Sequence, residues 1–375
     1  LELTVLPSLR DVYEVIQSSG SGRYDLIRMD VAWMDELAKK LFRPLHQIPF
    51  DWDGLLAQTL PEFGDSYTSV NGERICVPYD PSTQLMFYRR DLFCDPTYKR
   101  MYFEAYRREL EVPKSFEDYN RIAGFFTRSL NPASPVQYGT TVAIGNVVVS
   151  PSEFLPRLFE QGGKLFNAKG QITVDTPEAL AALKNYRETY ACSDRTVHDI
   201  WKNVLEGFAD GSAAMTVVFI NYASHILNSK MSSIAGKLGF APVPGGRPLS
   251  GGGVVGITRS CAHPETACAF LSWLYSNQTA PAFTLLGGLS PCRSAYSNRD
   301  IKERYPWLSA ARRSFPSAQR RSGSAYYSNF SELQMENILA AYVQRAVLGV
   351  CTPEEALAQA QAEMDAHFTA NSEFL

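Results

Sequence analysis

Few groups of residues in this sequence have the spacing of a catalytic, cofactor-binding or metal-binding motif. For most of them the neighbouring residues argue against such a site. Asp51 and Asp53 flank Trp52 as an acid pair would, but we favour a solvated loop before a helix. The glycines of GGGVVG (251–256) fit the G-x-G-x-x-G pattern, yet a Pro/Gly loop precedes them, β-prone residues follow, and Ser276 stands where an acid is needed. No Walker A, HExxH or GxSxG motif occurs, and the five histidines lack partner spacing. We therefore expect no enzyme activity, no cofactor and no metal site.

One segment is basic, because Lys and Arg outnumber Asp300 and Glu303 between Arg293 and Arg321. It contains two prolines and no recognisable nucleic-acid motif, which favours a solvated surface over a nucleic-acid interface. The net charge of −3 for the whole chain also gives no indication of a nucleic-acid partner.

The length of the chain indicates more than one hydrophobic core. Its 375 residues exceed the roughly 250–300 at which a single hydrophobic core stops growing, so two lobes are expected. Its 45% hydrophobic and 20% charged residues are typical of a globular protein, and no apolar run approaches the roughly 18–20 residues of a membrane span. The seven cysteines are scattered without CxxC spacing, which suits a reducing compartment better than an oxidising one.

Apolar periodicity predicts alternating strands and helices. The expected order is a strand over 1–6, a helix over 9–17, a strand over 24–29 and a helix over 32–42. This alternation is typical of βαβ units with a parallel sheet, whose ligands bind at the carboxyl ends of the strands. Asp30 and Trp33 directly follow the second strand and are therefore candidates for such a position.

Further helices are predicted from their N-terminal residues. Ser115 begins an approximate capping box, and Thr176-Pro177 places proline at the first helical position. Thr352 and Glu355 form a capping box proper before the last predicted helix.

Several segments, taken in order, resemble the family 1 extracellular solute-binding proteins, the sugar-binding subunits of bacterial ABC transporters. The resemblance rests on YDLIRMDVAWMDELAKKLFRPL, ICVPYDPSTQLMFYRRDLF, EVPKSFEDY, LFEQGGKLFNAKGQITVDTPEALAAL, FADGSAAMTVVFINY and GFAPVPGGRPLSGGGVVGITRSCAHPETACAFLSWL. Each motif alone is degenerate, but together they run over nearly the whole chain in the family's order. The family's first strand and helix, which belong before Leu1, are missing.

The resemblance implies an α/β, two-lobed, periplasmic-binding-protein-like fold of type II, as in maltose-binding protein. Each lobe would be a mostly parallel sheet flanked by helices, and crossing strands would join the lobes. The expected N-terminal lobe comprises residues 1–82 and 247–291, and the C-terminal lobe comprises 83–246 and 292–375. In this arrangement PYDPSTQ (78–84) is a passage between lobes and a hinge candidate, because a plain hairpin would favour Asn-Gly or Asp-Gly.

The resemblance also implies a solute gripped between lobes that close like a hinge, with aromatic faces on sugar rings and polar groups on hydroxyls. Carried over position by position, the ligand-binding residues are Asp30, Trp33, Tyr79, Asp80, Asn221, Tyr222, Gly252, Gly253 and Arg293. The two glycines would let backbone N–H groups approach the ligand closely. Core packing is the alternative for each aromatic residue, and a surface position is the alternative for the arginine.

Two functions remain open for such a chain. The first is a transport receptor outside the cell that delivers a sugar or oligosaccharide to ABC permease subunits. The second is a cytoplasmic ligand sensor behind a DNA-binding domain upstream of Leu1, which the cysteines, the Arg-rich composition and the missing leader favour. In neither does this chain insert into a membrane or contact DNA itself. A glycosidase is a third class, and it would need two acids flanking the bond.

Overall fold

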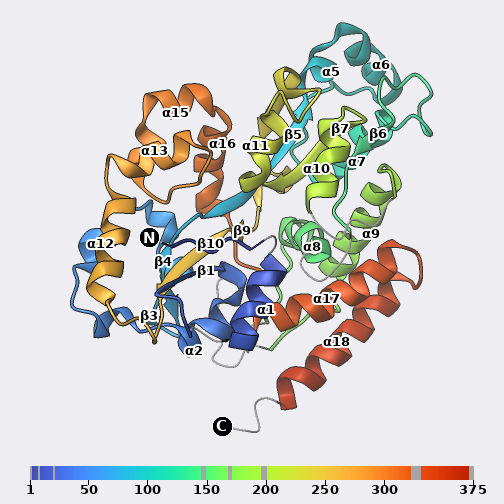
Figure 1. Ribbon diagram of the computed structural model, residues 1–375. Coiled ribbons are helices and arrows are strands. Elements are labelled where there is room, and N and C mark those ends of the chain that lie inside the picture. The colour runs from blue at the N-terminus through green and yellow to red at the C-terminus, as the bar shows by residue number, and fades with distance from the viewer. Residues whose placement is uncertain are drawn as a thin grey trace. The chain divides into compact units, whose positions relative to one another are not determined.

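The computed structural model describes residues 2–6, 9–19, 22–144, 149–167, 171–195, 201–321 and 331–370 (Figure 1). It divides into two compact units. Unit 1 comprises Leu1–Ser82, Ser250–Arg312 and Ser324–Leu333, and unit 2 comprises Thr83–Leu249, Arg313–Gly323 and Gln334–Leu375. The main divisions therefore fall at residues 82, 249 and 312, where the sequence analysis places them at 82, 246 and 291.

Residues 292–312 lie in unit 1 because they are tied to its N-terminal segment. Cys292 forms an isolated antiparallel bridge with Thr59. The next residue, Arg293, donates from its backbone nitrogen to Gln58 O at 2.9 Å and from Nε to Thr59 O at 2.8 Å.

The sheet of unit 1 has three strands in the order β1-β10-β4 (Figure 1). The strands of this unit are β1 (Leu26–Asp30), β2 (Ser69–Val70), β3 (Glu73–Arg74), β4 (Val77–Pro78), β9 (Ser250–Gly251) and β10 (Gly253–Ile257). β10 runs antiparallel to both of its neighbours. The pairing places the ends of β1 and β4 opposite Gly253 and Val254, the first two residues of β10.

The strand predicted over residues 1–6 is wrong for the residues that the structure describes there. Residues 2–6 have no strand, and Leu3 and Val5 are each 77% exposed. Leu1 lies outside the described residues. The helix predicted next is confirmed as α1 (Leu9–Ser19), and the following strand is confirmed as β1.

The expectation of mostly parallel sheets is also wrong for the described ladders. In unit 1 both ladders of the sheet are antiparallel. In unit 2, β5 (Ser82–Arg89) pairs antiparallel with β7 (Ala213–Phe219) and β8 (Leu238–Ala241), while β6 (Tyr138–Thr140) and β7 run parallel. The reason in unit 1 is that β10, far away in the sequence, lies between β1 and β4. Those two strands run in the same direction, as their alternation with helices predicts, but they do not pair with each other.

The helical elements of unit 1 are mostly short. They are α1 (Leu9–Ser19), η1 (Val31–Trp33), η2 (Met34–Ala38), α2 (Lys39–Leu41), η3 (Leu45–Gln47), α3 (Trp52–Leu56), η4 (Pro61–Phe63), α4 (Asp65–Thr68), α12 (Pro264–Tyr275), α13 (Thr279–Leu285), α14 (Arg293–Ser297) and α15 (Arg299–Arg304), and α16 (Trp307–Ser314) begins in this unit. The helix predicted over 32–42 is therefore a succession of a 3₁₀ turn, a π-helical turn and a short α-helix.

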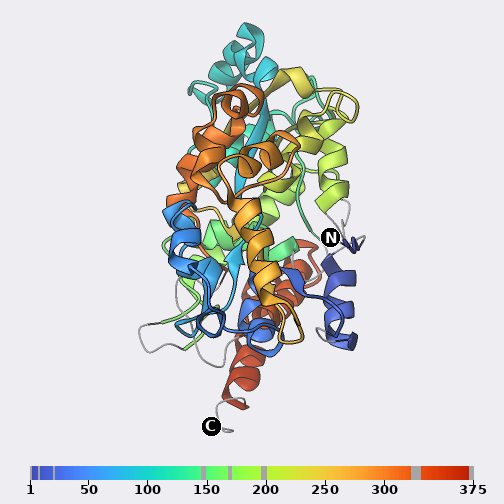
Figure 2. The ribbon, with the colours of Figure 1, turned by 60° about the vertical axis from the view of Figure 1, so that its left-hand side comes forward.

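One face of the unit 1 sheet is covered by α12, which Figure 2 shows in front of the strands. Leu271 and Tyr275 of this helix pack with Val77, Val255 and Ile257 in the hydrophobic core. Burial of this apolar face fixes the position of β10 between its two partners.

Unit 2 is built around the strand order β6-β7-β5-β8. These strands are β5 (Ser82–Arg89), β6 (Tyr138–Thr140), β7 (Ala213–Phe219) and β8 (Leu238–Ala241). The strands β5 and β7 are buried on both faces, since the consecutive residues Leu85, Met86 and Phe87 of β5 and Val218 of β7 are all fully buried. β5 begins at the unit boundary, within the segment that the sequence identifies as a passage between lobes.

Helices surround these strands. They are α5 (Arg90–Cys94), α6 (Pro96–Tyr106), α7 (Phe116–Phe125), α8 (Val149–Glu160), α9 (Pro177–Ala191), α10 (Trp201–Ala209), η5 (Ile220–Tyr222), α11 (Ala223–Leu227), η6 (Ala235–Lys237), η7 (Pro244–Gly246), η8 (Phe315–Ser317), α17 (Glu332–Val347) and α18 (Pro353–Ala370). Figure 1 shows α17 and α18 as a helical hairpin.

The predicted helix caps are confirmed. Ser115 Oγ accepts from Asp118 N at 3.1 Å at the start of α7, and Thr176 Oγ1 accepts from Ala179 N at 3.2 Å at the start of α9. At α18 the capping box is reciprocal: Glu355 N donates to Thr352 Oγ1 at 3.2 Å, and Thr352 N donates to Glu355 Oε2 at 2.9 Å. Each bond satisfies a backbone N–H that the helix itself leaves without an acceptor.

A buried ion pair connects α8 to its surroundings in unit 2. Arg157 Nη1 donates to Glu153 Oε2 at 2.8 Å, and the two side chains are only 1% and 5% exposed. Arg157 Nε also donates to Asn185 Oδ1 and Nη2 donates to Thr189 Oγ1, both at 3.1 Å on α9. The other oxygen of Glu153 accepts from Ala143 N at 3.1 Å. The protein itself therefore satisfies most of the hydrogen-bonding capacity of this pair.

Candidate functional site

Several of the residues implied by the resemblance meet at one corner of the unit 1 sheet. Asp30, the last residue of β1, lies opposite Gly253, the first residue of β10. The backbone nitrogens of Tyr79 and Asp80, which follow β4, both donate to Gly253 O, at 2.9 and 3.3 Å. We call this group, together with Arg28, the Asp80 corner.

Arg28 is the member of the corner that the sequence analysis misses. Its Nε donates to Asp80 Oδ1 at 3.1 Å and its Nη2 donates to Oδ2 at 2.9 Å, which makes a bidentate ion pair. Strand residues two apart point to the same face, so Arg28 and Asp30 share a face of β1. Ile27 and Met29 point to the opposite face and are buried. A charged residue inside the otherwise apolar stretch LIRM (26–29) was the available signal.

Gly253 of the corner and its neighbour Gly252 are required by contacts inside unit 1. Gly252 has a φ of +85°, which disfavours a side chain, and its carbonyl accepts from Val31 N at 3.1 Å. A Cβ on Gly253 would overlap with the guanidinium of Arg28 and the carboxylate of Asp80. The absence of a side chain at 253 therefore makes room for the ion pair, a role that the sequence analysis does not assign to it.

Electrostatics in the corner depend on how far each group is withdrawn from water. Burial raises the pKa of Asp80 above its ordinary value, and the guanidinium of Arg28 opposes this shift only in part. Burial works against the charge of Arg28, but the neighbouring Asp80 carboxylate outweighs it and the pKa of Arg28 is raised. Burial also raises the pKa of Tyr79, which keeps its hydroxyl a neutral hydrogen-bond donor and acceptor.

Asp30 and Trp33 occupy different environments although they follow the same strand. Asp30 Oδ1 accepts from Ala32 N at 3.0 Å and caps η1, while its side chain stays part of the corner. Trp33 is 6% exposed, and its ring lies edge-on against Tyr13 of α1 with the ring centroids 5.3 Å apart. The described contacts of Trp33 are therefore those of core packing, and its contact with ligand stays a prediction.

Two of the implied residues belong to unit 2. Asn221 and Tyr222 lie in η5, directly after the carboxyl end of β7, where Asn221 is exposed and Tyr222 half-buried. Arg293 is in unit 1, but its guanidinium is engaged by Thr59 O rather than by the Asp80 corner. The ligand contacts of these three residues also stay predictions.

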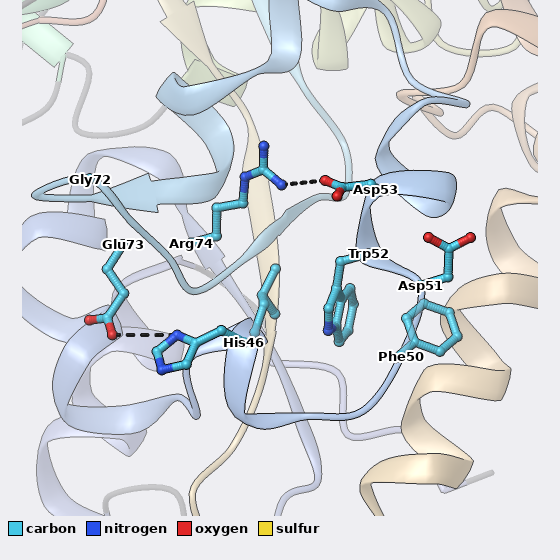
Figure 3. Close-up of a pocket in the computed structure, with 9 residues that line it drawn as sticks. His46, Phe50, Asp51, Trp52, Asp53, Gly72, Glu73 and Arg74 are labelled. Atoms are coloured by element: carbon cyan, nitrogen blue, oxygen red, sulfur yellow. Dashed lines mark hydrogen bonds and ion pairs between the residues drawn. The ribbon is translucent and has the colours of Figure 1, made fainter.

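Unit 1 also contains a separate pocket of about 580 Å³ between the loop 45–53 and the β2–β3 hairpin (Figure 3). It is lined by Leu45, His46, Phe50, Asp51, Trp52, Asp53, Gly72, Glu73 and Arg74. Arg74 Nη1 lies 2.6 Å from Asp53 Oδ1, and His46 Nδ1 lies 3.8 Å from Glu73 Oε1. Asp51 caps α3 by accepting from Gly54 N at 2.9 Å, which confirms that Asp51 precedes a helix.

The charged side chains of this pocket thus already have partners within unit 1, and those of the Arg74–Asp53 pair are well exposed, at 49% and 88%. Exposed pairs of this kind contribute little energy. The pocket is therefore a weaker candidate than the Asp80 corner.

Other kinds of site find no support among the described residues. They contain no group of three or more His, Cys, Asp or Glu side chains placed to hold a metal ion. No helix in the same part of the chain combines the length and apolar character needed to cross a membrane. The basic segment is largely engaged internally: Arg312 pairs with Glu62 at 2.6 Å, Arg299 pairs with Glu303 at 2.8 Å, and Arg320 is buried.

Two α/β units, with the chain passing repeatedly from one to the other, have the architecture of the type II periplasmic binding proteins. Comparison with known families confirms it, because residues 13–309 match the bacterial extracellular solute-binding proteins. The chain belongs to this family, and its class of function is the binding of a solute. The resemblance inferred from the sequence is thereby confirmed.

Curated relatives are distant. The chain is 27% identical over 176 residues to the putative ABC transporter periplasmic-binding protein YcjN of Escherichia coli, a match that covers 47% of this chain and 34% of that protein. It is 20% identical over 359 residues to a probable amino-acid ABC transporter periplasmic-binding protein of Sinorhizobium fredii, covering 93% of this chain and 77% of the relative.

Solved structures share the fold over almost the whole chain. A ribitol complex of an ABC transporter solute-binding protein from Agrobacterium radiobacter has a TM-score of 0.81 at 20% identity, covering 98% of this chain and 90% of that one. A maltose-bound protein of T. maritima has a TM-score of 0.77 at 24% identity, covering 95% and 88%. A D-mannitol complex from Agrobacterium vitis has a TM-score of 0.77 at 19% identity, covering 96% and 89%. The two-lobed fold class is confirmed.

Proposed function

We propose that the chain binds a sugar or sugar alcohol, without chemical change, as the solute-binding component of an ABC transporter outside the cytoplasmic membrane. The observation that carries the proposal is the Asp80 corner. It presents an ion pair, a second carboxylate and a phenol at the strand ends of unit 1, in a chain that belongs to a solute-binding family.

The chemistry of the corner suits hydroxyl groups. Each hydroxyl is both a donor and an acceptor, and a guanidinium beside carboxylates offers donors and acceptors side by side. Tyr79 adds an aromatic surface whose ring lies 6.1 Å from that of Phe283. Maltose, ribitol and D-mannitol, the ligands bound in the structurally similar proteins reported above, are all rich in hydroxyl groups.

The transport role is supported by the relatives, which are named as binding proteins of ABC transporters. Permease subunits of such a transporter are then the expected protein partners. The ligand-sensing regulator considered from the sequence has no comparable support among the relatives reported above.

A thermal-shift screen tests the proposal, because a ligand that binds only the folded state raises the melting temperature. The panel contains ribitol, mannitol, maltose and longer oligosaccharides, with free amino acids as the comparison suggested by the name of the Sinorhizobium relative. A shift with a sugar or polyol is expected, and the ligand should be recovered chemically unchanged. A shift with amino acids alone would assign the chain to another substrate class.

Variants then test the implied ligand residues one at a time. Replacing Tyr222 with Ala should weaken binding by roughly 1–3 kcal/mol if its ring stacks on the ligand. Asn221→Ala tests the neighbouring polar side chain. Unchanged affinity in both variants would remove η5 from the site.

A further inference from the structure

The Arg28–Asp80 pair has hydrogen-bonding capacity that the described part of the chain does not use. A guanidinium carries five N–H donors, and two of those of Arg28 are directed at Asp80. Among the described residues, Asp80 is its hydrogen-bond acceptor, so three donors remain. The side chains of the pair are 28% and 25% exposed, which leaves them accessible to a small solute.

The charges of the corner do not balance. Arg28 contributes one positive charge, while Asp80 and Asp30 each contribute one negative charge. Asp30 is close enough to act electrostatically on both members of the pair. A ligand that meets the free donors of Arg28 therefore also meets an excess of negative charge.

The position of the pair is built into the fold. Arg28 lies on β1 and Asp80 follows β4, 52 residues later, so the pair spans the sheet over β10. Gly253 leaves the space in which the two side chains meet. Since the guanidinium and the carboxylate hold each other in a bidentate geometry, neither must reorganise when a ligand arrives.

We propose that the Arg28–Asp80 pair selects the ligand by charge, donating from Arg28 to hydroxyl groups of a neutral polyol or sugar while the carboxylates of Asp80 and Asp30 reject anionic analogues. This inference rests on the proposed function and deepens it. Sugar acids and sugar phosphates, whose anionic groups an unpaired arginine would attract, are excluded because Asp80 already neutralises Arg28 and Asp30 adds a further negative charge.

The experiment compares ligands that differ in charge and little in shape. Affinities of the wild-type chain for ribitol and mannitol are measured by titration calorimetry beside those for ribonate and mannonate. We expect each neutral compound that binds to bind at least about tenfold more tightly than its acid. Glucose is measured beside glucuronate, an acid that keeps the pyranose ring, in case the site prefers cyclic sugars.

Variants assign the selection to the pair. Asp80→Asn removes one negative charge with little change of shape, and it should reduce the neutral-to-acid affinity ratio about tenfold. Arg28→Gln should weaken binding of the neutral ligand at least tenfold. Asp80→Glu keeps the charge and should keep the ratio even where the affinity itself declines.

Asp53→Asn is the matched control, because it removes the same charge from the exposed Arg74–Asp53 pair of the same unit. It should change neither affinity nor ratio. Melting curves of every variant establish that the comparison is made between folded proteins.

The outcomes separate the two proposals. If the wild type binds a neutral ligand but Asp80→Asn and Asp53→Asn give the same ratio, charge selection by the pair is overturned and the proposed function stands. Equal wild-type affinity for a polyol and its acid overturns it as well. If no sugar or polyol of the panel binds the wild type, the proposed function itself fails and this inference fails with it.

Discussion

The two units each contain an arginine–carboxylate pair withdrawn from water, and the pairs differ in what else they contact. In unit 2, Arg157 uses Nε, Nη1 and Nη2 on protein acceptors, and its guanidinium carbon lies 4.1 Å from the ring centroid of Phe116. In unit 1, Arg28 contacts Asp80 through two donors, and its other donors have no acceptor among the described residues.

This difference distinguishes an ion pair that stabilises the fold from one that can also bind a ligand. Burying a charge is unfavourable unless its hydrogen-bonding capacity is satisfied. The Arg157 pair meets that requirement with protein atoms and connects α8 to α9. The Arg28 pair meets it only in part, and a ligand can complete it.

The largest expected effect is on stability, at Arg157. Arg157→Met leaves the buried carboxylate of Glu153 without its cation, and we expect it to lower the free energy of unfolding by about 3–5 kcal/mol. Arg28→Met should cost no more than about 1 kcal/mol, because its pair is partly exposed. Urea unfolding followed by tryptophan fluorescence measures both. Equal losses would show that the two pairs do not differ in the way described.

A second comparison uses two glycines of β10. A Cβ on Gly253 would overlap with Arg28 and Asp80, and a Cβ on Gly256 would overlap with the ring of Phe42 in the core. Each alanine substitution should lower stability by about 1–3 kcal/mol, as overpacking does. Only Gly253→Ala should also weaken ligand binding in the molecules that remain folded, which titration calorimetry can measure. Loss of affinity in Gly256→Ala of the same size would contradict a local role for Gly253.

The pH dependence of ligand affinity is a third test of the role of the Arg28–Asp80 pair. Because burial raises the pKa of Asp80, this carboxylate becomes protonated at a higher pH than an ordinary aspartate, and affinity for a neutral ligand should decline as the pH falls through that pKa. Below the pKa, each pH unit should cost up to about 1.4 kcal/mol of binding. Asp80→Asn should remove this dependence, and a wild-type profile that matches the variant would show that Asp80 is not the titrating group.

The same shift acts on folding with the opposite sign. A carboxyl whose pKa is raised in the folded state favours folding when it is protonated, so its contribution is present below the ordinary aspartate pKa and is lost as the pH rises through the folded pKa. Mild acid should therefore weaken binding without a loss of stability that originates from Asp80. Melting temperatures of the wild type and Asp80→Asn across the same pH range test this.

The smallest effect is expected at the pocket of Figure 3. Arg74→Gln breaks an exposed ion pair with Asp53 and should change the free energy of unfolding by at most about 1 kcal/mol. Ligand affinity should not change. A clear loss of affinity, measured by calorimetry, would indicate that the ligand binds in this pocket rather than at the Asp80 corner.

Local features of the fold could be predicted from the sequence because their causes are local. Caps such as Ser115 and Thr352 act within one turn of the helix that they begin. The pairing of β10 with β1 and β4 could not be predicted in this way, since both partners lie far from it in the sequence. The predicted alternation of elements gave the direction of the strands but not their neighbours.

The candidate site also combines residues that could be predicted from the sequence with residues that depend on distant contacts. The family resemblance supplied Asp30, Tyr79, Asp80 and Gly253, and the structure brings these together. Arg28 lies inside the first quoted family segment as a charged residue of an apolar strand, but its partner is 52 residues away, so local sequence could not identify the pair. Nor could local sequence distinguish a packed Trp33 from a ligand-facing one, because the answer depends on Tyr13 of a different helix.

The burial of five of the seven cysteines determines how the folded chain would respond to an oxidising environment. Cys76, Cys192, Cys261, Cys268 and Cys292 are buried, and burial raises the pKa of Cys268 and Cys292 to about 11. Disulfide exchange proceeds through the thiolate, which such thiols scarcely form at neutral pH. These cysteines are therefore shielded from oxidants once the chain has folded, and their number does not argue against an oxidising environment. Cys94 is exposed and Cys351 half-buried, so a thiol reagent applied to the native protein should label these two positions first.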